Sequence, residues 1–66
     1  MAKYIDFLYA DLATGEEFLV ELKTEGKTVK ELKGEANIIA EENFEAPTFK
    51  GIISEEQAEM MGLDTY

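Results

Sequence analysis

The sequence predicts a small α+β fold, in which a single-layer, three-stranded sheet carries one main helix and a short C-terminal helix. Two patterns predict it: apolar residues alternate with a period of two on both sides of a turn at 13–15, and an apolar stripe with helical spacing follows from residue 29. Hydrophobic residues make up 45% of the 66 residues, which is too many for a disordered acidic tail. A chain this short has room for one core, so we expect a single compact domain over residues 1–66.

A β-hairpin is expected first, with strands at 3–12 and 17–23 and a turn in which Gly15 can take a positive φ. The alternation predicts one inward face that packs against the rest of the chain. It consists of Ile5, Phe7, Tyr9, Phe18, Val20 and Leu22. The outer face retains Tyr4, Leu8 and Leu19.

The main helix should begin near Val29, because Thr28 and Glu31 fit a capping box, and it should continue to about Asn43. Its core stripe is predicted to contain Val29, Leu32, Ala36, Ile39 and Ala40. Pro47 disfavours helical geometry in the preceding residue and therefore ends the helix.

A third strand is expected at 48–53, parallel to the second strand and antiparallel to the first, which predicts the sheet order 2-1-3. A short helix should follow, capped by Ser54 with Gln57 and closed by Gly62. Apolar residues of this segment are expected to cover the outer face or to extend the main core at its edge. They are Ala58, Met60, Met61, Leu63 and Tyr66.

The composition excludes most catalytic chemistry, because the chain has no His and no Cys. Ser54 is the only serine, and its place before a helix indicates a cap rather than a nucleophile. Acidic pairs at 16–17, 41–42 and 55–56 lack the deep cleft that would perturb their pKa values. We expect no enzyme, no metal site and no cofactor; an enzyme using carboxylates alone would require a concave pocket holding an acid of strongly raised pKa.

The charge narrows the class of partner, since 15 Asp and Glu outnumber 6 Lys and the net charge is −9. Direct nucleic-acid binding and anionic membrane surfaces are both disfavoured by this charge. No apolar run approaches the roughly 20 residues needed to cross a bilayer. Asp6 stands where a signal peptide has its apolar region, so a cytoplasmic location is expected.

One candidate partner site lies opposite the core stripe of the main helix, where Ile38 should face solvent. The site comprises Gly34, Ile38, Glu41, Glu42 and Glu45. Its acids gather at the C-terminal end of the helix, which the helix dipole disfavours. A functional acidic surface is one explanation of this pattern, and drift on a surface with little effect on stability is the other. The alternative is a solvated face with one exposed isoleucine, which needs no explanation.

Two functions follow as hypotheses. The leading one is a non-enzymatic protein-binding module with a carboxylate-rich surface against a basic partner, by analogy with the small acidic DNA mimics of phages and mobile elements. The alternative is a structural protein that forms homodimers or larger assemblies through a strand edge or the outer sheet face. That face comprises Tyr4, Leu8, Leu19 and Ile52.

Overall fold

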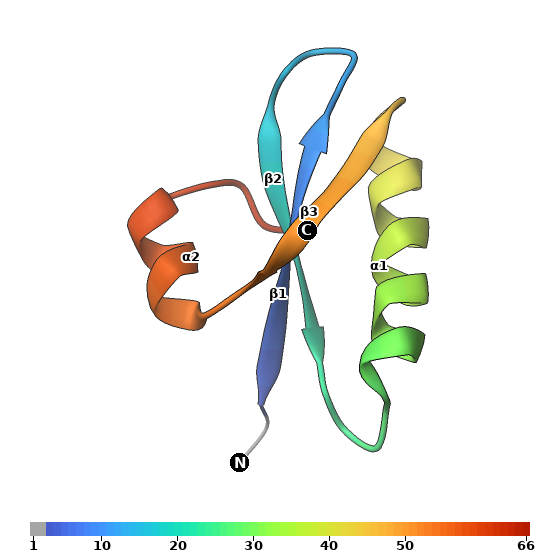
Figure 1. The fold of residues 1–66 in the computed structure, drawn as a ribbon, viewed down its shortest axis with the longest axis vertical. Helices are drawn as coiled ribbons and strands as arrows, with labels where there is room; N and C mark the ends of the chain where they lie inside the picture. Colours follow the sequence, from blue (N-terminus) through green and yellow to red (C-terminus); the bar gives the residue numbers. More distant parts are fainter. Residues whose placement is uncertain (1–2) are drawn as a thin grey trace.

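The computed structural model describes residues 3–66 and confirms the predicted α+β architecture. The elements in chain order are β1 (Tyr4–Asp11), β2 (Glu17–Lys23), α1 (Val29–Asn43), β3 (Pro47–Ile53) and α2 (Glu55–Met61). The sheet order is β2-β1-β3, and β1 is antiparallel to both neighbours. Helix α1 lies on one face of the sheet and α2 on the other (Figure 1). Among residues 3–66 no helix is long and apolar enough to cross a bilayer.

The main core lies between the sheet and α1, as the alternation predicts. Its fully buried members are Phe7, Tyr9, Phe18, Val20, Leu32, Ala36 and Ala40. Ile5, Leu22 and Ile39 are partly buried against them. The prediction was wrong for Val29, which is 54% exposed. Val29 is the first residue of α1, and a side chain at a helix end has neighbours on one side only.

The helix caps follow the sequence patterns with one difference. Ser54 and Gln57 form the complete reciprocal capping box of α2. At α1, the Thr28 hydroxyl oxygen accepts from the Glu31 N–H at 3.2 Å, but the Glu31 carboxylate accepts from the Thr28 hydroxyl instead of the backbone N–H. Only half of the predicted box is therefore formed at α1. Gly62 ends α2 with φ 61°, a left-handed conformation that favours glycine.

Asp11 joins the hairpin turn to the start of β3. Its carboxylate accepts from the Ala46 N–H at 3.0 Å, the Thr14 hydroxyl at 3.0 Å and the Ala13 N–H at 3.3 Å. Burial raises the pKa of Asp11, but these hydrogen bonds stabilise the charged form and bring the pKa below its ordinary value. The negative charge of Asp11, at the end of β1, is thus stabilised by hydrogen bonds from two backbone N–H groups and one hydroxyl.

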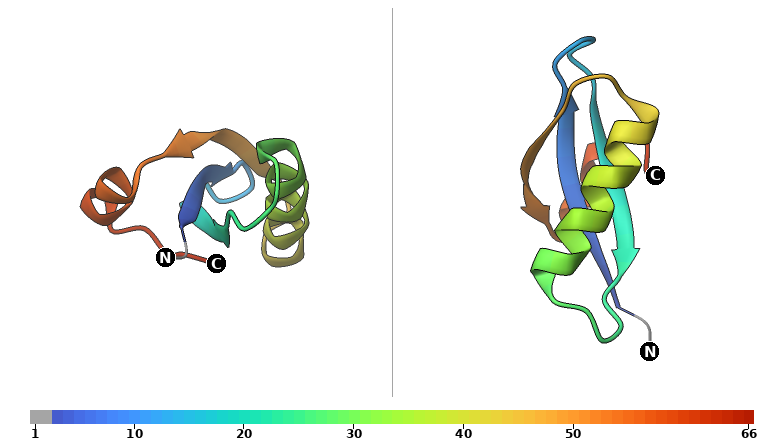
Figure 2. Two further views of the ribbon diagram at one scale, coloured as in Figure 1. Left: turned by 90° about the horizontal axis from the view of Figure 1, so that it is seen from below. Right: turned by 90° about the vertical axis from the view of Figure 1, so that its right-hand side faces the viewer.

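The segment after α2, residues 62–66, crosses to the outer edge of β2, and its end lies beside that strand (Figure 2). Thr65 forms a parallel bridge with Leu19. The ring of Tyr66 packs edge-on against Phe18 and Phe44, at centroid distances of 5.6 and 5.4 Å. The C-terminal segment therefore covers part of the outer face with α2 and extends the main core with Tyr66.

Candidate functional site

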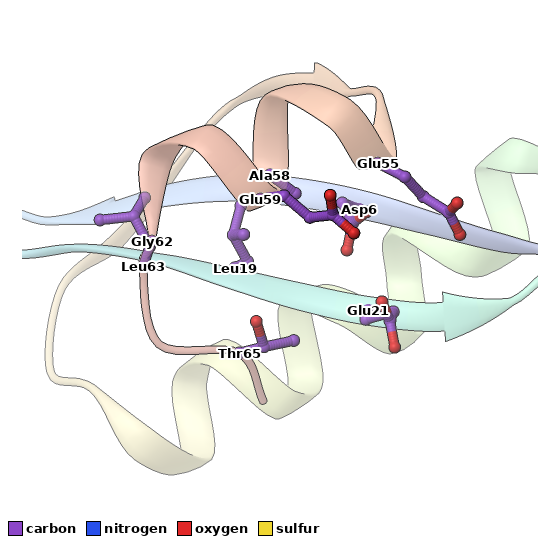
Figure 3. Close-up of a pocket in the computed structure, with 9 residues that line it drawn as sticks. All are labelled: Asp6, Leu19, Glu21, Glu55, Ala58, Glu59, Gly62, Leu63 and Thr65. Atoms are coloured by element: carbon purple, nitrogen blue, oxygen red, sulfur yellow. The ribbon is translucent and has the colours of Figure 1, made fainter.

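A pocket of about 380 Å³ lies between α2 and the outer face of the sheet. Four of its lining residues carry carboxylates: Asp6 and Glu21 from the sheet, and Glu55 and Glu59 from α2 (Figure 3). No basic side chain of residues 3–66 lines it. The other lining residues are Leu19, Ala58, Gly62, Leu63 and Thr65. We call this the acidic pocket.

Strand geometry brings Asp6 and Glu21 together on the floor of the acidic pocket. Asp6 shares the outer face of β1 with Tyr4 and Leu8, since alternate residues of a strand point the same way. It lies directly opposite Glu21 of β2 in the antiparallel register. Like charges facing each other across two strands are destabilising, so pairing of the strands does not account for these residues.

Helix geometry supplies the other two carboxylates. Glu55 and Glu59 are four residues apart in α2 and therefore lie on one side of the helix, with Ala58 between them. Ala58 is half-buried, and beneath this helix Leu19 of β2 is only 1% exposed. The two glutamates therefore line the pocket from the helix, opposite the acids of the sheet.

Asp6 is the group most affected by this arrangement. Asp6 is 2% exposed, and it faces the carboxylate of Glu21 across the strand pair. Burial raises the pKa of Asp6 above its ordinary value, and the negative charges of Glu21 and Glu55 raise it further. Among residues 3–66 the one ion pair joins Lys27 and Glu35 at 2.8 Å, away from this pocket.

The chemistry of the acidic pocket suits a positively charged organic group. Carboxylate oxygens accept several hydrogen bonds, and charge-assisted bonds to an ammonium or guanidinium group are the strongest of this kind. Within the described part of the chain, no three acidic side chains are grouped closely enough to hold a metal ion. The carboxylates of the acidic pocket are acceptors for the ammonium or guanidinium group of a Lys or Arg side chain.

The predicted partner site consists of four residues of α1 and Glu45, which follows the end of the helix at Asn43. Gly34, Glu41, Glu42 and Glu45 are all exposed, and Ile38 is 59% exposed. Two lysines near the start of α1 have other partners: Lys27 pairs with Glu35, and the Lys33 ammonium lies 4.5 Å from the centre of the Phe49 ring. Helix α1 and helix α2, which lines the acidic pocket, are on opposite sides of the sheet (Figure 1). The binding role of the predicted partner site stays a prediction.

The expected self-association face is not one continuous exposed surface. Leu19 is buried beneath the C-terminal segment and Leu8 is half-buried, whereas Tyr4 and Ile52 are 40% and 46% exposed. This is a correction: Leu19 cannot contact a second copy while residues 62–66 lie over it. The physical reason is that the chain's own C-terminal segment supplies the cover.

Sequence reasoning missed the acidic pocket, although a signal was present. Asp6 occupies a mid-strand position between the outer-face residues Tyr4 and Leu8, where a charge is unusual if that face becomes covered. The pairing with Glu21 follows from the hairpin register, and the spacing of Glu55 and Glu59 follows from the helix. What could not be predicted was the side of the sheet on which α2 docks.

The comparisons with known proteins identify no relative of this chain. No protein-family model, curated protein or solved structure matches it.

Proposed function

We propose that this chain is a small, non-enzymatic protein-binding module, and that its acidic pocket receives a Lys or Arg side chain of a basic partner. One observation carries the proposal: Asp6 is buried among other carboxylates, and no basic residue of the described chain lines the pocket. A buried charge next to like charges destabilises the free protein, and a cationic side chain from a partner would remove that cost. Where the partner's basic surface also binds nucleic acid, the module would compete with it.

The raised pKa of Asp6 also suits a general acid, so an acid–base enzyme is a second candidate. An enzyme must orient its substrate against the reacting groups, and neutral hydrogen-bonding side chains commonly do so. Within residues 3–66, Thr65 is the only such side chain in the lining. Binding of a cation requires nothing beyond the carboxylates, and the geometry therefore favours binding over catalysis.

Assembly through strand edges has less support. The β2 edge already pairs with residues of the C-terminal segment. At the other edge, β3 begins with Pro47, carries the exposed Lys50 and has a register irregularity opposite Leu8 and Tyr9. Proline, an edge lysine and a bulge are the features that discourage strands from pairing between molecules. Assembly remains the alternative function, to be tested by sedimentation at low and high salt.

The proposal can be tested with two variants that each remove three negative charges. The pocket variant carries Glu21→Gln, Glu55→Gln and Glu59→Gln, and the helix variant carries Glu41→Gln, Glu42→Gln and Glu45→Gln. Binding of an oligolysine peptide is measured by fluorescence anisotropy at low and moderate salt. We expect the pocket variant to lose about tenfold or more in affinity and the helix variant to lose much less.

The matched charge change separates a site from a general charge effect. Equal losses in both variants would show that only net charge matters, which would contradict a specific pocket. A larger loss in the helix variant would transfer the partner site to the surface around Ile38. Circular dichroism on each variant checks that the fold is retained.

A further inference from the structure

The β2 edge is hydrogen-bonded to residues 64–66 as to a short parallel strand. The Leu19 N–H donates to the Asp64 carbonyl at 2.9 Å, and the Tyr66 N–H donates to the Leu19 carbonyl at 2.8 Å. The Glu21 N–H donates to the Tyr66 carbonyl at 3.2 Å. Backbone bonds of this kind are how a sheet edge binds an extended peptide from another molecule.

Two neighbouring side chains of this strand enter two different environments. Thr65 lies beside Leu19 on the outer face and lines the acidic pocket. Tyr66 points to the opposite face, where its ring stands nearly perpendicular to Phe18 and Phe44, which are themselves stacked with centroids 3.9 Å apart. The edge therefore combines a backbone ladder, an acidic subsite and an aromatic subsite.

The chain's own segment suits the aromatic subsite but not the acidic one. Thr65 is neutral and forms no side-chain hydrogen bond with the carboxylates among the described residues, while Asp64 adds a further negative charge nearby. Thr65 is exposed and Tyr66 is 42% exposed, so neither side chain is fully buried at the edge. A segment held mainly by backbone bonds at a sheet edge is among the first parts of a protein to open.

We infer that the β2 edge is the docking site for an extended segment of the basic partner, with a Lys or Arg in the place of Thr65 and an aromatic residue in the place of Tyr66. Residues 64–66 occupy this site in the free chain and must leave when the partner binds. The inference rests on the proposed function, because the basic side chain enters the same acidic pocket. It adds the form of the partner, which is a strand parallel to β2.

Competition with the chain's own segment sets the affinity that such a partner needs. A tethered segment has a high effective concentration at its site, in the millimolar range for a short flexible linker. A partner that formed only the same backbone bonds and the same aromatic contact would not displace residues 64–66. The basic side chain is the difference, because only the partner neutralises the carboxylates around Asp6.

The test uses the isotopically labelled 66-residue chain carrying Tyr66→Ala, which weakens the resident segment. Two synthetic peptides with the sequence of residues 62–66 are titrated, one carrying Thr65→Lys and its matched control carrying Thr65→Glu. We expect the lysine peptide to shift the amide resonances of Leu19 and Glu21, and to bind at least about tenfold more tightly than the glutamate peptide.

In the chain with its natural Tyr66, the same two amides should respond more weakly, because the resident segment competes. Replacing Thr65→Lys within the full chain should slow hydrogen exchange of the Leu19 and Glu21 amides about tenfold, and adding Asp6→Asn should remove most of that gain. These measurements do not depend on the folding of the Tyr66→Ala variant.

The results distinguish the inference from the function on which it rests. Shifts of Glu55 and Glu59 without any response of Leu19 and Glu21 would overturn strand docking and leave the pocket as a cation site. Equal binding of the two peptides would show that the edge ignores charge and would also overturn the inference. The proposed function itself is judged by the oligolysine binding of the pocket and helix variants.

Discussion

At the scale of single residues, two buried aspartates of β1 have opposite surroundings. Asp6 and Asp11 are each 2% exposed. Asp11 accepts hydrogen bonds from two backbone N–H groups and a hydroxyl, whereas Asp6 meets the carboxylates of Glu21 and Glu55. The pKa of Asp11 is therefore lowered and that of Asp6 is raised. Asp11 stabilises the fold when charged, and Asp6 destabilises it.

This contrast predicts opposite effects of the same substitution. The folded-state pKa of Asp6 is raised above the ordinary value of 3.8. Between these two pKa values the native state binds more protons than the unfolded state. The contribution of Asp6 to the free energy of unfolding therefore rises as the pH falls through that window. Asp6→Asn should raise the free energy of unfolding at pH 7 by on the order of 1 kcal/mol. Urea denaturation at several pH values would measure this.

Asp11→Asn is the matched control, since it also removes one charge without changing the size of the side chain. The lowered pKa of Asp11 means that its stabilisation is present above 3.8 and is lost as pH falls through the folded pKa. The control should therefore destabilise the protein at pH 7, and the difference from the unmodified chain should vanish in acid. A loss of stability in both variants would contradict the interpretation of Asp6.

At the scale of elements, the structure depends on how each helix ends and on what it covers. Helix α1 buries Leu32, Ala36 and Ala40 against the sheet, whereas α2 has no fully buried residue. Helix α2 is instead held at its ends, by the Ser54 cap at one and by Gly62 with residues 64–66 at the other. One side of the acidic pocket is thus formed by the well-packed sheet, and the other by helix α2, which has few buried contacts.

Two glycines provide a paired test of this difference. Gly34 lies within α1, and a Cβ atom added there would have no neighbouring atom within 4 Å, so Gly34→Ala should stabilise the fold by about 0.5–1 kcal/mol. Gly62 has φ 61°, so Gly62→Ala should cost about 1 kcal/mol. Thermal or urea denaturation of the two variants measures both changes.

The two variants should also differ in hydrogen exchange. Gly62→Ala should speed exchange of the Leu19 and Glu21 amides far more than that of Phe7, since it loosens the segment that bonds to them. Gly34→Ala should slow all three or leave them unchanged. Uniformly faster exchange in Gly62→Ala would show that α2 and the C-terminal segment unfold with the rest of the domain.

At the scale of the whole molecule, charge is the dominant feature. The chain carries a net charge of −9, and residues 3–66 contain one ion pair. Carboxylates lie on both sides of the sheet, in the acidic pocket and around Ile38. Such an excess of one sign keeps a protein soluble but destabilises the compact state through self-repulsion.

Salt should therefore stabilise this fold. The Debye length falls from about 10 Å at 0.1 M to about 3 Å at 1 M ionic strength, which screens repulsion between the carboxylates. The melting temperature should rise between low and moderate NaCl, and the rise should be smaller in the pocket variant with three neutralised glutamates. A melting temperature that does not change with salt would show that the charges are too well solvated to matter.

Local patterns in the sequence were sufficient for most of the fold. The alternation around Phe7 and Val20, the helical stripe ending at Ala40 and the cap at Ser54 each depend on residues close together in the chain, so the strands, helices and sheet order could be predicted. The exposure of Ile38 and its neighbouring acids followed from the same helical geometry. Whether they bind a partner is a question that local pattern does not answer.

The acidic pocket and the occupied β2 edge, by contrast, arise from packing between distant segments. Both depend on which side of the sheet α2 takes after β3 and on how residues 62–66 return to β2. Those placements bring together segments more than 40 residues apart, such as Leu19 and Thr65. The periodicity of the sequence does not predict such long-range contacts. Local pattern thus specifies the elements and the excess of acid, whereas long-range packing brings four of the acids into one pocket.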